Sequence, residues 1–154
     1  MSLYLLLKTL HILSATVLFG TGLGIAYFKW TTDRSGDVRA IRVVSERVVI
    51  ADWLFTTPAI IVQPITGIAL ATEAGYPLFQ GWIGLSLLLY LAAGACWIPV
   101  VWLQYRMRDL ARASDAAGVA LDQRYRDCAR LWFRLGVPAF AALIVVFWLM
   151  VARP

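Results

Sequence analysis

Residues 3–28 read LYLLLKTLHILSATVLFGTGLGIAYF, and Lys8 is the one side chain among them that carries a full charge. About 20 mainly apolar residues are enough for a helix to cross the hydrocarbon core of a bilayer. The stretch is too long for the apolar region of a signal peptide, and no A-x-A-like cleavage site ends it. We therefore expect a transmembrane helix here.

The composition of the whole chain supports this interpretation. Of the 154 residues, 61% are hydrophobic and 15% are charged. A soluble domain is typically about 45–50% apolar and about 25% charged. Three more apolar segments follow the first, at residues 48–72, 81–103 and 131–151. The sequence thus predicts an all-α polytopic membrane protein: one domain, a four-transmembrane-helix bundle in contact with the lipid bilayer.

The net charge of +5 is concentrated in two loops, residues 29–47 and 104–130, whereas residues 73–80 contain no lysine or arginine. Because basic loops stay on the cytoplasmic side, we expect a bacterial inner-membrane protein with both termini in the periplasm. The charge therefore predicts topology and not a nucleic-acid partner. We expect residues 29–47 to form a helix at the interface that runs into the second span, and the later loop to be a helical hairpin broken near Ala117-Gly118.

Several kinds of site are excluded by counting. The chain has one histidine, His11, and two cysteines, Cys96 and Cys128. This is too few for a zinc site of the Cys/His type or for a disulfide framework. No two carboxylates share a helical face within a span, so hydrolytic chemistry is not expected either.

The first span carries the most distinctive polar residues. Lys8 and His11 are three residues apart and share a helical face with Ala15. At about 1.5 Å per residue, His11 lies roughly 12 Å deep. One hypothesis is that His11 is the axial metal ligand of a b-type haem, with Lys8 near a propionate and the small Ala15 leaving room for a flat ligand. The alternative is a histidine hydrogen-bonded to Gln63 or to a threonine of a neighbouring helix.

The second span is the other polar one. Gln63 and Thr66 fall at the depth of His11 and close the proposed haem site, whereas Asp52 lies near the cytoplasmic side. Asp52 is expected to pair with an arginine, and Arg47 and Arg134 are the candidates.

Pro64 leaves the carbonyl of Ile60 without its helical donor, so we expect that oxygen to face a cavity or an ion. A rival function follows from this span. A small transporter or channel subunit would use Gln63, Thr66, the Pro64 kink and Glu73 as a polar path.

A third interpretation rests on Gly20-x-x-x-Gly24, which lies inside the first span and indicates close helix packing. The protein would then be a scaffold or assembly partner in a membrane complex. A homo-oligomer is expected in all three cases, because four helices enclose a small interior.

Four stretches of the sequence also carry a resemblance to known proteins: residues 7–14, 20–24, 54–59 and 63–67. Over nearly the whole chain, the sequence resembles the bacterial predicted integral membrane proteins classed as a domain of unknown function, family 2269. More distantly, Lys8-x-x-His11 resembles the first helix of the membrane protoporphyrinogen oxidase HemJ and of the copper-resistance CopD domain. The HemJ resemblance implies haem binding at His11, and with it a redox or haem-handling function. HemJ's essential lysine in its third helix has no counterpart in residues 81–100.

Overall fold

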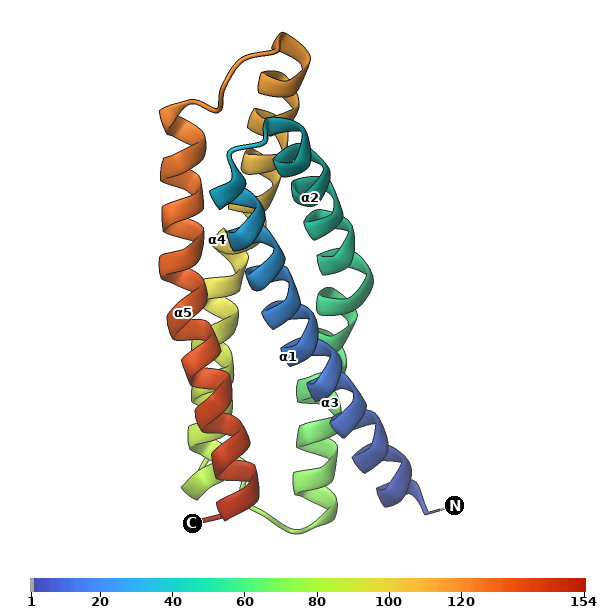
Figure 1. The fold of residues 1–154 in the computed structure, drawn as a ribbon. Helices are drawn as coiled ribbons and strands as arrows, with labels where there is room; N and C mark the ends of the chain where they lie inside the picture. Colours follow the sequence, from blue (N-terminus) through green and yellow to red (C-terminus); the bar gives the residue numbers. More distant parts are fainter. Residues whose placement is uncertain (1) are drawn as a thin grey trace.

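The structure, a computed structural model, describes residues 2–154 and consists of helices joined by short turns. They are α1 (Leu3–Ser35), α2 (Val38–Ala51), the π-helical turn η1 (Asp52–Thr56), α3 (Thr57–Glu73), α4 (Gly81–Ala117) and α5 (Gln123–Ala152), shown in Figure 1. α2, η1 and α3 follow one another without a break. Four helical segments are therefore long and apolar enough to cross a membrane. The predicted all-α fold with four spans is confirmed.

Glycine ends the helices before two of the turns, and aspartate begins the helices after them. α1 ends before Gly36, whose φ of 71° is readily adopted only by glycine, and α4 ends before Gly118 at φ 64°. The next helices begin at Asp37 and Asp122, whose side chains accept hydrogen bonds from the backbone N–H of Ala40 and Tyr125. The predicted break near Gly118 is confirmed.

The two turns at residues 36–37 and 118–122 lie at the same end of the bundle, which we call the basic end (Figure 1). Residues 74–80 and both ends of the chain lie at the other end, called here the termini end. The helix expected to run from residues 29–47 into the second span is present as α2, but it begins only at Val38. α1 continues to Ser35, and α2 packs along α4 and α1 in line with α3, because its apolar face is buried against them.

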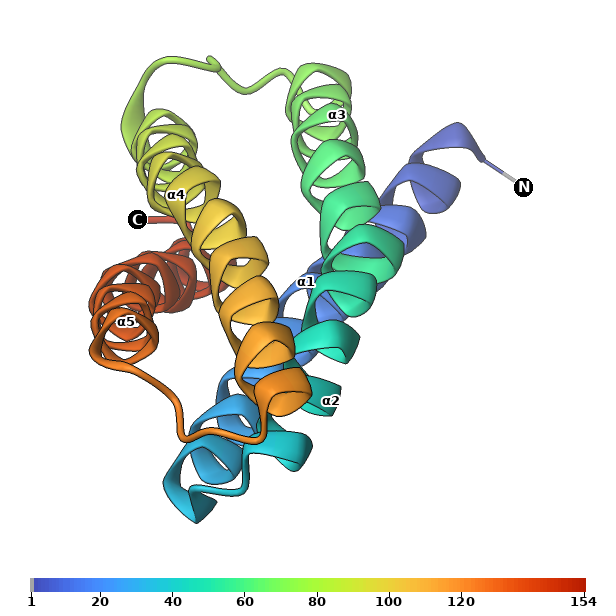
Figure 2. The same ribbon diagram turned by 90° about the horizontal axis from the view of Figure 1, so that it is seen from above.

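The hydrophobic core lies toward the basic end. Ile41 of α2, Leu103 and Met107 of α4, and Tyr125 and Trp132 of α5 are buried together there. α4 packs mainly against α5 and α2, while α3 packs mainly against α1. Toward the termini end the helices consequently diverge as two pairs, α1 with α3 and α4 with α5 (Figure 2).

A buried charge cluster joins α1 to α5 within this core. Lys29 is only 2% exposed, and its Nζ contacts a carboxylate oxygen of Asp33 and the hydroxyl of Tyr125. The same hydroxyl donates to Asp33 at 2.7 Å. The sequence assigned Lys29 to a basic loop. It is buried because α1 extends beyond the expected span and packs against α5.

Candidate functional site

His11 lies on the side of α1 that faces α3. Its Nδ1 is 2.9 Å from the hydroxyl oxygen of Thr66, and its Nε2 is 3.2 Å from the amide nitrogen of Gln63. Ser14, one turn further along α1, donates its hydroxyl to the amide oxygen of Gln63. The structure thus brings together three of the predicted residues and adds Ser14. The i, i+3 spacing of Ser14 from His11 is the sequence signal that would have found it.

The protons of this cluster can be assigned from its chemistry. An amide nitrogen only donates, so Gln63 donates to Nε2 of His11. The ring proton of the neutral imidazole is then on Nδ1 and is donated to Thr66, whose own hydroxyl donates to the carbonyl of Val62 at 2.8 Å. Each of the four side chains therefore has at least one hydrogen-bond partner. Gln63 and Thr66 are 7% and 4% exposed, which makes this pairing necessary.

An axial haem ligand needs a ring nitrogen with a free lone pair. His11 has none in this arrangement, because Gln63 occupies Nε2 and Nδ1 carries the proton. α3 also lies directly against the ring, since a Cβ added at Gly67 would be 3.0 Å from Cε1 of His11. For a metal ion held by side chains alone, residues 2–154 offer no group of three or more His, Cys, Asp or Glu. The residues present do not fit a haem iron, and the alternative interpretation of His11, a hydrogen bond to Gln63 and a threonine, is what the structure shows.

A cavity of about 690 Å³ lies beside this cluster, between the two diverging helix pairs. We call it the His11 cavity. Its lining is mainly apolar and includes Ala15. Two cations also line it, Lys8 from the first turns of α1 and Arg153 at the end of α5, while no Asp or Glu of the described residues does.

The predicted polar path is not assembled. Gln63 lines the His11 cavity, but Thr66 is turned toward the imidazole. Glu73 is exposed at the end of α3 and lines neither this cavity nor the next one. The reason is that Thr66 and Gln63 satisfy His11, whereas Glu73, two turns after Thr66, lies at the exposed end of α3.

The carbonyl freed by Pro64 also has a partner. The Tyr90 hydroxyl donates to the carbonyl of Ile60 at 2.7 Å. Tyr90 lies, with Leu18 and Leu143, between the His11 cavity and a second cavity nearer the basic end. Ile60 lines this second cavity, as the sequence predicts, but its carbonyl is satisfied by a side chain from α4 and not by an ion.

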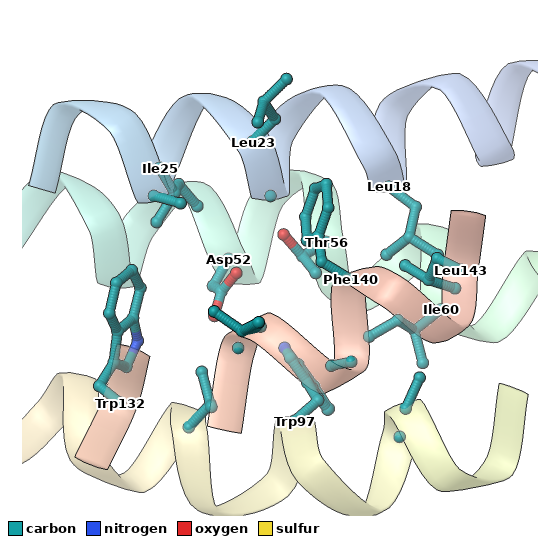
Figure 3. Close-up of a pocket in the computed structure, with 18 of the residues that line it drawn as sticks. Leu18, Leu23, Ile25, Asp52, Thr56, Ile60, Trp97, Trp132, Phe140 and Leu143 are labelled. Carbon is teal, nitrogen blue, oxygen red and sulfur yellow. The ribbon is translucent and has the colours of Figure 1, made fainter. Parts of the chain in front are cut away.

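The second cavity, of about 220 Å³, is called here the Asp52 cavity. Asp52 and Thr56 of η1, Trp97 of α4 and Trp132 of α5 point into it (Figure 3). Asp52 is 5% exposed, and within the described chain it forms no ion pair. The expected pairing with Arg47 or Arg134 is wrong, because both arginines are exposed while the π-helical turn directs Asp52 inward.

Comparison with known protein families identifies the family of this chain. A family described as predicted integral membrane protein, DUF2269, matches residues 5–154. The protein belongs to this family. DUF2269 is a family of unknown function, so membership establishes an integral membrane protein and no activity. No curated protein and no solved structure matches the chain significantly.

Proposed function

We propose that this protein binds an amphipathic organic anion in the His11 cavity, as a carrier or handling component for such molecules in the membrane. The apolar body of the ligand would lie between the helix pairs, and its carboxylate or phosphate head would lie at Lys8 and Arg153. One observation carries the proposal: a largely apolar cavity of about 690 Å³ whose two charged lining residues are both cations. Its size suits a ligand of ordinary organic dimensions.

The position of the two cations strengthens the argument. All other lysines and arginines lie between residues 29 and 134, so Lys8 and Arg153 are the only ones near the ends of the sequence. They come from opposite helix pairs, and both line the same cavity. A cation that lies against an apolar surface at the edge of the hydrocarbon attracts an anionic head group while its stem covers apolar area.

The test is a binding measurement with dansyl-undecanoic acid on the protein in zwitterionic lipid nanodiscs. The double variant Lys8→Gln/Arg153→Gln is expected to bind the probe about tenfold more weakly or worse, equivalent to about 1.4 kcal/mol. Arg39→Gln is the matched control, because Arg39 is an exposed arginine at the basic end that lines neither cavity. Unchanged binding in the double variant, or binding of the corresponding uncharged alcohol with equal affinity, would refute the proposal.

Haem binding stays a prediction from the sequence that the same preparation tests. The proposal above expects no Soret band that depends on His11, since both ring nitrogens are engaged. A band that shifts on reduction with dithionite and disappears in His11→Ala would replace the anion proposal with a haem-handling function.

We also propose that the basic end faces the bacterial cytoplasm, with both termini in the periplasm. The support is the placement of the basic residues, which gather around the turns at residues 36–37 and 118–122. With Cys96 and Cys128 replaced by serine, an impermeant maleimide should label Tyr76→Cys on intact spheroplasts and Val119→Cys only after permeabilisation. The reverse pattern would invert the topology.

Self-association is proposed through the face of α1 that carries Gly20 and Gly24. A Cβ added at either glycine meets nothing within 4 Å, so the described chain leaves this face uncovered. Small residues at this spacing let a second helix approach closely. Gly20→Ile should lower the dimer fraction in disuccinimidyl cross-linking of native membranes. An unchanged dimer fraction would show that this face of α1 is not the dimer contact.

A further inference from the structure

Four polar atoms on the wall of the Asp52 cavity have no hydrogen-bond partner within the described part of the chain. They are Oδ2 of Asp52, Oγ1 of Thr56, and Nε1 of Trp97 and of Trp132. Buried polar atoms in native proteins almost always have partners, and each one that is left without a partner costs free energy. Thr56, Trp97 and the amide of Gln104 all lie close to the Asp52 carboxylate, so these polar groups converge on one part of the cavity wall, where an occupant would supply the missing hydrogen bonds.

The backbone explains why two of these groups meet. Pro58 has no N–H to donate to the carbonyl of Leu54, and the helix widens at this point into the π-helical turn η1, where Thr57 donates to Asp52. Asp52 and Thr56 are four residues apart and project together into the cavity (Figure 3). π-helical turns inside long helices are frequent at binding sites.

The charge of the cavity wall identifies the ligand's charge. Asp52 is the one Asp, Glu, Lys, Arg or His among the described lining residues, and no cation of residues 2–154 pairs with it. A buried carboxylate without a counter-ion is strongly unfavourable, and such residues within membrane spans commonly contact substrates or ions. A cationic ligand would supply that counter-ion.

The rest of the wall identifies its chemical class. Five aromatic side chains line the cavity, and aromatic faces attract organic cations. The lone pairs of Asp52 and Thr56 accept hydrogen bonds from an ammonium group, whereas the indole N–H groups of Trp97 and Trp132 need an acceptor. A volume of about 220 Å³ limits the ligand to a small molecule.

We propose that the Asp52 cavity binds a small organic ammonium ion with an apolar body and an oxygen that accepts hydrogen bonds. Asp52 and Thr56 hold the ammonium group, and Trp97 and Trp132 donate to the oxygen. This site is independent of the anion site proposed for the His11 cavity, since it uses different residues and the opposite charge. Tyr90, Leu18 and Leu143 form the wall between the two cavities.

The test uses three radiolabelled probes on the detergent-purified protein: phenylethanolamine, phenethylamine, which lacks the hydroxyl, and phenylethanol, which lacks the ammonium group. Phenylethanolamine should bind about tenfold more tightly than phenylethanol. Asp52→Asn should abolish this preference, and Trp97→Phe should reduce the preference of phenylethanolamine over phenethylamine. Glu73→Gln is the control, because Glu73 is an exposed carboxylate away from both cavities.

Equal affinities of the unmodified protein for phenylethanolamine and phenylethanol, or no saturable binding of any of the three, would overturn the proposal. So would a folded Asp52→Asn protein that keeps the preference. If Asp52→Asn fails to fold, Thr56→Val replaces it and should weaken phenylethanolamine binding. Lys8→Gln/Arg153→Gln should keep ammonium binding, which separates failure of this proposal from failure of the anion site.

Discussion

The hydroxyl of Tyr90 on α4 donates to the carbonyl of Ile60 on α3 across 2.7 Å. Pro64, four residues after Ile60, cannot donate to that carbonyl because proline has no N–H. The Tyr90 hydroxyl therefore supplies the hydrogen bond that the Ile60 carbonyl does not receive within its own helix. It does so where α3 and α4 make few other contacts, at the wall between the His11 cavity and the Asp52 cavity.

Tyr90→Phe tests this relationship. The variant keeps the ring but leaves the buried carbonyl of Ile60 without a donor, so the free energy of unfolding should fall by about 1–3 kcal/mol. SDS titration of the protein in mild detergent, followed by far-UV circular dichroism, measures this. Tyr27→Phe should change it little, because Tyr27 is exposed and its hydroxyl makes no hydrogen bond in the described chain. Equal stability of the two variants would contradict the assigned role of Tyr90.

Removal of the Gln63 side chain should make His11 available as a ligand. Gln63→Ala deletes the amide that donates to Nε2 and leaves that lone pair free. Added hemin should then give a Soret shift with Gln63→Ala that is absent from the unmodified protein and from Gln63→Ala/His11→Ala. A shift of equal size with the unmodified protein would show that Gln63 does not block the histidine.

Gly67 and Gly24 form a matched pair of glycine substitutions. A Cβ at Gly67 would lie 3.0 Å from the His11 ring, whereas one at Gly24 meets nothing within 4 Å. Gly67→Ala should destabilise the protein by roughly 1–3 kcal/mol because the ring must shift. For the monomer, Gly24→Ala should be neutral or stabilising by up to about 1 kcal/mol, since alanine is the better helix former and the contact proposed for Gly24 is made only between two copies of the chain. The same SDS titration compares the two variants. If Gly67→Ala is as stable as Gly24→Ala, Gly67 does not lie as close to the His11 ring as described.

The buried cluster at the basic end gives a fourth prediction. Tyr125→Phe removes the hydroxyl that contacts both Lys29 and Asp33, so a nearly buried ammonium loses a partner. The expected loss is about 1.5–3 kcal/mol, the range for hydrogen bonds to charged groups. Thermal unfolding measured by near-UV circular dichroism checks it. An unchanged midpoint would mean that Asp33 alone satisfies Lys29.

The sequence by itself determined the four spans and their order. A lipid environment leaves the backbone no partners except its own, so a long apolar segment such as residues 3–28 has to be helical. The depth of His11, Gln63 and Thr66 also follows from counting residues along helices. For this reason the sequence predicts, as one of two interpretations of His11, a hydrogen bond to Gln63 and a threonine.

Only the tertiary structure decided what each polar residue faces. The rotation and tilt of a helix depend on packing against its neighbours, and spacing along one helix does not contain this information. Lys29 is buried because α1 continues past the membrane span, and Asp52, which lies in η1, faces a cavity while Arg47 and Arg134 are exposed. The His11 cavity exists because the helix pairs diverge toward the termini end, which is a property of the whole bundle.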